Sequence, residues 1–146
     1  MRISTKGRYG LRAALELAIH YGGPPISAKE IAASQDISEK YLEHLIATLK
    51  NAGLVQSVRG ARGGYKLARS PSQITLLEVL KPLEGDFSPV ECVDRPEVCN
   101  RSSACITREI WKRIKDSIED VLESMTLQDL VEEYNAKTKS GLMYYI

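Results

Sequence analysis

Apolar residues recur at helical spacing in the first fifty residues of the chain, and two short polar segments interrupt them. The first predicted helix follows Ser4 and Thr5, whose hydroxyl groups can cap a helix, and it ends at the Gly-Gly-Pro segment of residues 22–24. Its apolar positions are Leu11, Leu15, Ala18 and Ile19. One face of this helix is therefore expected to pack in a core.

A second, short helix and a third helix follow, with only a tight turn between them. Ser27 and Glu30 have the spacing of a capping box at the start of the second helix. Residues 35–37 form the predicted turn, Ser38 caps the third helix, and Gly53 ends it. The apolar face of the third helix consists of Leu42, Leu45, Ile46 and Leu49. Two short helices joined in this way predict a helix-turn-helix.

A β-hairpin with a glycine-rich tip is predicted directly after these helices. Its strands span residues 54–58 and 65–68, and the tip contains Gly60, Gly63 and Gly64. Glycine permits the positive φ angles and the close backbone contacts of such a tip. A helix-turn-helix followed by a hairpin is a winged helix, so the predicted fold class is mainly α with a small β-wing.

The second half of the chain predicts a short helix, a loop and a long amphipathic helix. Thr75 and Glu78 have capping-box spacing at the start of the short helix, which ends near Gly85. The long helix begins at about Ser103 and spans roughly five to six turns. Its apolar stripe consists of Ile106, Ile110, Ile114, Ile118, Val121 and Met125. We expect this long dimerisation helix to pack against its twin, which gives a homodimer able to bind a palindromic operator.

The chain ends in an apolar segment that follows a polar stretch. A last predicted helix carries Leu127, Leu130 and Val131. Residues 135–141 are expected to be flexible, and residues 142–146 read Leu-Met-Tyr-Tyr-Ile. Two alternatives remain open for this tail, because it can pack on its own dimer or bind a partner. The predicted organisation is a winged helix-turn-helix domain at 1–85, a cysteine-rich cluster-binding loop at 86–105, and a dimerisation helix with the C-terminal tail at 106–146.

Charge is distributed unevenly along the chain although the net charge is only +1. Residues 1–69 hold 11 Lys and Arg against 5 Asp and Glu, a net of +6, whereas residues 70–146 hold 9 against 14, a net of −5. A basic half is the electrostatic feature expected of a nucleic-acid binder. No apolar run approaches a membrane span and no secretory segment opens the chain, so we expect a cytoplasmic protein.

DNA-binding side chains are expected at the start of the third helix and at the tip of the wing. Residues near the N-terminus of a recognition helix contact base edges, and arginines enter a narrow minor groove. Glu43 can accept a hydrogen bond from a cytosine amino group. The candidate residues are Ser38, Lys40, Tyr41, Glu43, His44, Arg59 and Arg62. An enzyme is not expected, because neither histidine lies near the cysteines in sequence and no glycine-rich phosphate loop is present.

All three cysteines of the 146-residue chain, Cys92, Cys99 and Cys105, lie in one polar segment of 14 residues. An odd number of cysteines does not favour a disulfide framework. Structural zinc sites use paired cysteines at closer spacing, and unrelated buried cysteines usually have apolar neighbours. These readings remain open, but three thiolates on a polar loop favour an iron-sulfur cluster.

Three segments of the chain resemble the Rrf-type family of winged-helix transcriptional regulators. They are the opening residues 1–11, the helix segment 38–53 and the wing 59–67. The resemblance implies a homodimeric repressor in which Glu43 contacts a base and Arg59 enters the minor groove. It also implies that Cys92, Cys99 and Cys105 hold a cluster that senses iron-sulfur, redox or nitric oxide status, with 2Fe-2S favoured over 4Fe-4S.

The fourth ligand of such a cluster is unknown, because this chain departs from the family pattern. Arg108 stands where one branch of the family supplies a histidine, and Arg8 stands where another supplies a carboxylate. The remaining candidates are Glu91, Asp94, Glu97, a small thiol and water.

The C-terminal residues give an alternative function. Tyr144, Tyr145 and Ile146 resemble the end of the family branch that represses genes of cysteine metabolism. That resemblance implies a tail that docks into cysteine synthase through a carboxylate and an apolar side chain. In this alternative the cysteines of the loop are vestigial or thiol-reactive.

Overall fold

The structure is a computed structural model that describes residues 2–144 of the chain. Its α-helices are α1 (Thr5–Ile19), α2 (Ala28–Gln35), α3 (Glu39–Asn51), α4 (Leu76–Glu84), α5 (Ile106–Glu123) and α6 (Leu127–Tyr144). Strands β1 (Val55–Val58) and β2 (Gly64–Leu67) pair antiparallel, and the short 3-10 helices are η1 (Pro71–Gln73), η2 (Glu91–Val93) and η3 (Pro96–Val98). The predicted fold class, mainly α with a small β-wing, is confirmed.

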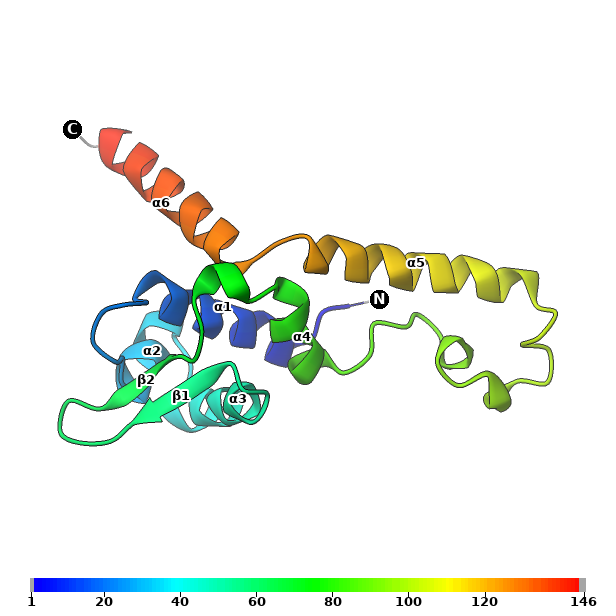
Figure 1. Cartoon of the computed structure of the whole chain (residues 1–146), viewed down its shortest axis with the longest axis horizontal. Helices are drawn as coiled ribbons and strands as arrows, with labels where there is room; N and C mark the ends of the chain where they lie inside the picture. The colour runs from blue at the N-terminus through cyan, green and yellow to red at the C-terminus, as the bar shows by residue number, and fades with distance from the viewer. Residues whose placement is uncertain (1, 145–146) are drawn as a thin grey trace.

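Helices α1 to α4, the hairpin and the start of α6 form one body around a single core (Figure 1). The largest fully buried side chains are Leu17, Ile31, Leu42, Leu45, Ile46, Leu49, Ile74, Val79 and Leu127. They include the whole predicted apolar face of α3. Residues far apart in sequence meet here, because α6 packs against α1, and the Leu127 N–H at its start donates to the Ile74 carbonyl. No helix of the described residues 2–144 is long and apolar enough to cross a membrane.

Serine hydroxyl groups cap the first three helices, as the sequence predicts. Ser4, Ser27 and Ser38 each accept a hydrogen bond from the backbone N–H three residues later, at 3.0, 3.1 and 3.0 Å. Asp36 ends α2 in the left-handed conformation with φ of 54°, which aspartate tolerates better than most residues. The turn between α2 and α3 is therefore as tight as a helix-turn-helix requires.

The wing glycines are needed for close backbone packing. A Cβ atom on Gly63 would lie 2.2 Å from the carbonyl oxygen of Val58, and one on Gly64 would lie 2.4 Å from that of Ile26. Ile26 also pairs with Tyr65 as an isolated bridge, which ties the base of the wing to the segment before α2. This bridge was not predicted from the sequence.

Helix α5 leaves the body, and the rest of the chain covers its apolar stripe only in part (Figure 1). Ile106, Ile110 and Val121 are 81%, 47% and 58% exposed. None of the 18 residues of α5 is buried. Such a partly uncovered stripe on a long helix agrees with the expected dimer contact.

The prediction that residues 135–141 are flexible is wrong, because α6 continues without a break to Tyr144. A reciprocal capping box starts this helix: Thr126 N–H donates to the Asp129 carboxylate at 2.9 Å, and Asp129 N–H donates to the Thr126 hydroxyl at 3.2 Å. Ala136, Lys137 and Lys139 lie within the stretch, and alanine and lysine are good helix formers. Polar composition alone therefore did not distinguish a solvated helix from a flexible tether.

Candidate nucleic-acid interface and cysteine loop

Helix α3 offers an exposed surface at its N-terminal end. Lys40, Glu43 and His44 are exposed, while the apolar face of the helix is buried. The hydroxyl of Ser38 accepts from Tyr41 N–H, so it acts first as a helix cap. The ring of Tyr41 is half-buried and packs edge-on against Tyr9 at 6.4 Å between centroids. Lys40, Glu43 and His44 are thus accessible to DNA. Tyr41 instead packs α3 against Tyr9 of α1.

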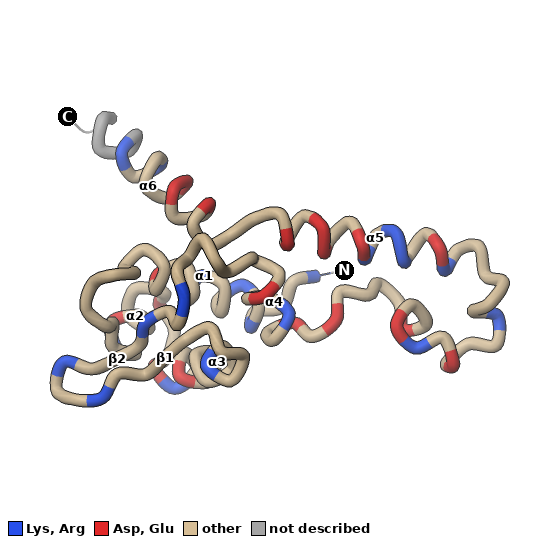
Figure 2. Tube along the Cα trace, viewed as in Figure 1, with Lys and Arg blue, Asp and Glu red and all other residues tan. Residues whose placement is uncertain are grey.

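The wing places two further cations beside α3. Arg59 and Arg62 are exposed between β1 and β2, and β1 packs against α3. Figure 2 shows two basic positions at the tip of the hairpin, both basic and acidic positions along α5, and acidic positions in the first turns of α6. The basic tip of the wing and the acidic first turns of α6 therefore lie on different parts of the molecule, while α5 carries both signs of charge. A duplex would meet the positive charge of Arg59 and Arg62 on the wing, whereas the two lysines of α3 are balanced by its two glutamates.

The cysteine loop runs between α4 and α5 and contains η2 and η3. Cys92 and Cys105 are partly buried and Cys99 is exposed. Cys105 is the N-cap residue of α5, so its position is tied to the long helix. Within residues 2–144 no three His, Cys, Asp or Glu side chains are grouped closely enough to hold a metal ion.

Cys105 has the chemistry of an activated thiol. The Thr107 hydroxyl, 3.2 Å from the sulfur, and the backbone N–H of Arg108 lower the pKa of the Cys105 thiol below its ordinary value. Both groups can donate hydrogen bonds to a thiolate, which stabilises the charged form.

The carboxylates considered as a fourth ligand are all engaged by cations. Glu91 and Glu97 pair with Arg95 at 2.9 and 3.5 Å. Asp94 pairs with Lys115 and accepts a hydrogen bond from the Ser88 hydroxyl. None of the three is therefore held toward the thiols as a free ligand.

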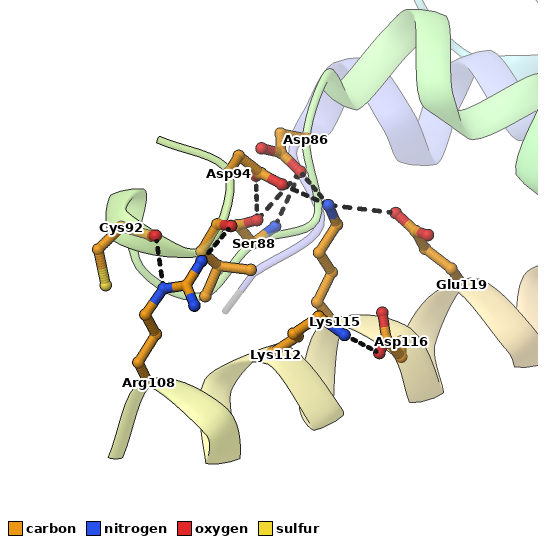
Figure 3. Close-up of polar contacts among 10 residues, drawn as sticks. Asp86, Ser88, Cys92, Asp94, Arg108, Lys112, Lys115, Asp116 and Glu119 are labelled. Atoms are coloured by element: carbon orange, nitrogen blue, oxygen red, sulfur yellow. Dashed lines mark hydrogen bonds and ion pairs between the residues drawn. The ribbon is translucent and has the colours of Figure 1, made fainter. Parts of the chain in front are cut away.

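Arg108 has a different role from the histidine that it replaces. Its guanidinium donates to the backbone carbonyl oxygens of Cys92 at 3.0 Å and Val93 at 3.3 Å (Figure 3). An arginine side chain is always protonated and has no acceptor, so it cannot coordinate a metal. It holds the first half of the loop against α5 instead.

Three thiols on one loop fit an iron-sulfur cluster in their chemistry, and a lowered thiol pKa at Cys105 favours thiolate ligation. Their arrangement does not form a site as the loop stands. The loop must change shape before Cys92, Cys99 and Cys105 can share one cluster.

Sequence reasoning missed a second polar cluster beside the loop. Lys115 on α5 lies among Asp86, Asp94 and Glu119, and its side chain is only 20% exposed (Figure 3). The spacing of Lys115 and Glu119 on one helix was a signal for that pair. The two aspartates lie 29 and 21 positions earlier in the chain, so no local pattern connects them to Lys115.

The predicted tail site falls largely outside the described residues. Tyr144 is the last residue of α6, and Tyr145 and Ile146 lie beyond residues 2–144.

Comparison with known proteins places this arrangement among transcriptional regulators. Residues 3–133 match the family described as Rrf2, iron-dependent transcriptional regulator. The transcriptional regulator CymR of Bacillus subtilis is 46% identical over 146 residues, which cover all of both chains. The regulator IscR of Photorhabdus laumondii is 36% identical over 97% of this chain and 85% of its own.

Solved structures give the same result. The structure of CymR, the global cysteine regulator of B. subtilis, has a TM-score of 0.77 at 46% identity and covers 91% of this chain and 98% of that one. The structure of T. potens IscR has a TM-score of 0.75 at 43% identity and covers 92% of this chain and 88% of that one. These relatives are regulators and not enzymes, as expected from the sequence.

Proposed function

This chain belongs to the Rrf2 family of transcriptional regulators, and we propose that it is a homodimeric repressor that binds a palindromic operator through α3 and the wing. The observation that carries this proposal is the combination of exposed Lys40, Glu43 and His44 on α3 with exposed Arg59 and Arg62 on the adjoining hairpin. A helix in the major groove and an arginine in the minor groove give such domains their base and shape selectivity.

Arg59 and Glu43 should affect binding in different ways. Arg59→Ala should weaken operator binding by roughly 1–3 kcal/mol, because it removes a groove contact. Glu43→Ala should relax base preference more than it weakens binding, since a carboxylate near phosphates is repelled and acts through selectivity.

Fluorescence anisotropy and selection from a random-sequence duplex library measure these two effects. Lys81→Ala, which removes an exposed cation on α4, is the control for loss of charge alone. Equal weakening by Arg59→Ala and Lys81→Ala would remove the wing from the interface. An unchanged selected motif in Glu43→Ala would remove Glu43 from base recognition.

The signal enters through the cysteine loop. Cys92, Cys99 and Cys105 would hold an iron-sulfur cluster, 2Fe-2S in preference to 4Fe-4S, which when bound would supply a centre sensitive to redox state, oxygen or nitric oxide. Support comes from the shared loop, the lowered pKa of the Cys105 thiol and the family description as iron-dependent. The candidates for the fourth ligand remain Glu91, Asp94, Glu97, a small thiol and water, and the pairing of the three carboxylates with cations favours a small thiol or water.

Single Cys→Ala variants test the ligand set. Each should lose the visible absorbance and the bound iron of anaerobically purified protein while the dimer stays intact, because the apolar stripe of α5 contains none of the three cysteines. Full iron retention in Cys99→Ala would contradict a three-cysteine site.

A second candidate function rests on the 46% identity to CymR over the whole of both chains. In this alternative Tyr144, Tyr145 and Ile146 dock into the active-site cleft of a cysteine synthase, where the terminal carboxylate and the isoleucine side chain are captured. Calorimetry with purified cysteine synthase should show binding that deletion of Ile146 removes. No heat of binding for the wild type, or equal binding by the deletion, would exclude this candidate.

A further inference from the structure

The cysteine loop is attached to α5 along only half of its length. We infer that Arg108 and Lys115 are positioning residues that fix residues 86–94 on α5, and that ligand closure occurs by movement of residues 96–104, which carry Cys99. This inference rests on the proposed cluster function and adds which part of the site moves.

Arg108 provides the first attachment. Its Nε and one terminal nitrogen donate to the carbonyl oxygens of Cys92 and Val93, so one partly buried guanidinium satisfies two backbone acceptors of η2 (Figure 3). Charged donors make stronger hydrogen bonds than neutral ones. Arg108 lies three residues after Cys105 on α5, so this contact holds Cys92 at the same end of the helix as Cys105.

Lys115 provides the second attachment, two turns further along α5. Its ammonium group pairs with Asp94, with Asp86 at 3.8 Å and with Glu119 at 3.9 Å. Ser88 links the two aspartates, because its backbone N–H donates to Asp86 at 3.2 Å and its hydroxyl donates to Asp94. A cation that is 20% exposed and shared among three carboxylates is screened less by water than a surface pair. The start of the loop is thereby fixed at two points of one rigid helix.

Residues 96–104 have no such attachment. In the described chain, no hydrogen bond or ion pair joins this segment to α5 or to the winged-helix body. Its hydrogen bonds and ion pairs are internal or made to Arg95: the Ser102 hydroxyl donates to the Pro96 carbonyl at 2.8 Å, and backbone bonds join Cys99 to Pro96 and Ala104 to Arg101. Its η3 turn also packs against η2. Cys99 is also the most exposed of the three cysteines.

The backbones of Cys92 and Cys105 are therefore held at the start of α5, and Cys99 is on the segment that can move at low cost. Movement of residues 96–104 toward the start of α5 would bring Cys99 to Cys92 and Cys105 without breaking either attachment. Because α5 is the expected dimer helix, its N-terminal end would then report the state of the loop to the partner subunit.

Hydrogen exchange of the full-length, metal-free protein measures this difference directly. In the wild type, amides of residues 88–95 should exchange at least roughly tenfold more slowly than those of residues 96–104. Arg108→Ala and Lys115→Ala should raise exchange in 88–95 and leave 96–104 unchanged. The matched controls are Arg113→Ala and Lys112→Ala, which remove exposed cations on α5 that do not contact the loop.

Thiol alkylation followed by mass spectrometry distinguishes local release of the loop from a loss of overall stability, because a less stable protein would expose all three cysteines. Cys92 should be alkylated faster in Arg108→Ala than in the wild type, while the rate for Cys99 stays the same. After anaerobic addition of iron and sulfide, wild-type protein should gain protection in residues 96–104.

Equal exchange of the two segments in the wild type, or no change in 88–95 in either variant, would overturn the inference. Core amides of α1 and α3 serve as the folding check, and a variant that lost their protection would be replaced by Arg108→Lys, which keeps the charge. The metal-free experiments involve neither DNA nor iron. A failure of the proposed function would instead appear as absent operator binding or absent iron in wild-type protein.

Discussion

Single side chains decide how closely α1 and α4 can pack. An added Cβ atom on Gly10 would lie 2.3 Å from a methyl group of the buried Leu83, a distance that real contacts do not reach. Glu84, the next residue, accepts hydrogen bonds from the backbone N–H and the hydroxyl of Ser4 at 2.8 and 2.6 Å. The carboxylate thus lies at the positive N-terminus of α1, where it is stabilised by the helix dipole.

Gly10→Ala should lower the free energy of unfolding by about 1–3 kcal/mol, because it overpacks a core contact. In an open helix the same change would be stabilising. Urea denaturation of Gly10→Ala, Leu83→Ala and the double variant checks the cause. The two effects should be strongly non-additive, because removing the Leu83 methyl groups makes room for the alanine. Simple additivity would contradict a direct contact.

Cys105 should be the most reactive thiol of the metal-free protein near neutral pH. The Thr107 hydroxyl and the Arg108 backbone N–H lower its pKa, so its thiolate fraction rises at lower pH than that of an ordinary cysteine. Iodoacetamide rates measured against pH should show a midpoint for Cys105 below the ordinary range of a cysteine thiol. Thr107→Val should move the Cys105 midpoint upward. Identical midpoints before and after this change would exclude Thr107 as the cause.

Among the helices and strands, the sequence predicted those whose boundaries are set by residues close by in the chain. Serine caps, the glycine tip and helical periodicity gave α1, α2, α3, the wing and α5, because each signal lies within a few residues of the element that it forms. The predicted last helix was too short, and the capping box at the start of α6 uses Asp129 in place of the usual glutamate or glutamine. The attachments of Arg108 and Lys115 join residues up to 29 positions apart, and no local pattern predicts them.

The apolar stripe of α5 should hold the dimer together. Ile110→Glu should shift the protein toward monomer at micromolar concentration, because it places a charge in the exposed apolar stripe of α5. Lys112→Glu, a change on the polar side of the same helix, should leave the dimer unchanged. Sedimentation velocity distinguishes the two. A fully dimeric Ile110→Glu variant would show that the dimer contact lies elsewhere.

At the scale of the whole molecule, α5 connects the two parts of the proposed function. The cysteine loop is attached to it through Arg108 and Lys115, and after its C-terminal end Leu127 packs into the core of the winged-helix body. A change in the loop can therefore alter the relative position of two winged domains in a dimer. The spacing of those domains determines how well both recognition helices fit one palindrome.

The most direct test compares one operator duplex with the wild-type protein in two states. Fluorescence anisotropy at fixed salt should give dissociation constants for iron-loaded and for chelator-stripped protein that differ by roughly tenfold or more, about 1.4 kcal/mol of coupling. The Cys99→Ala variant should bind with one affinity under both treatments. Equal dissociation constants for the two wild-type states on every palindromic operator tested would contradict regulation through the cysteine loop.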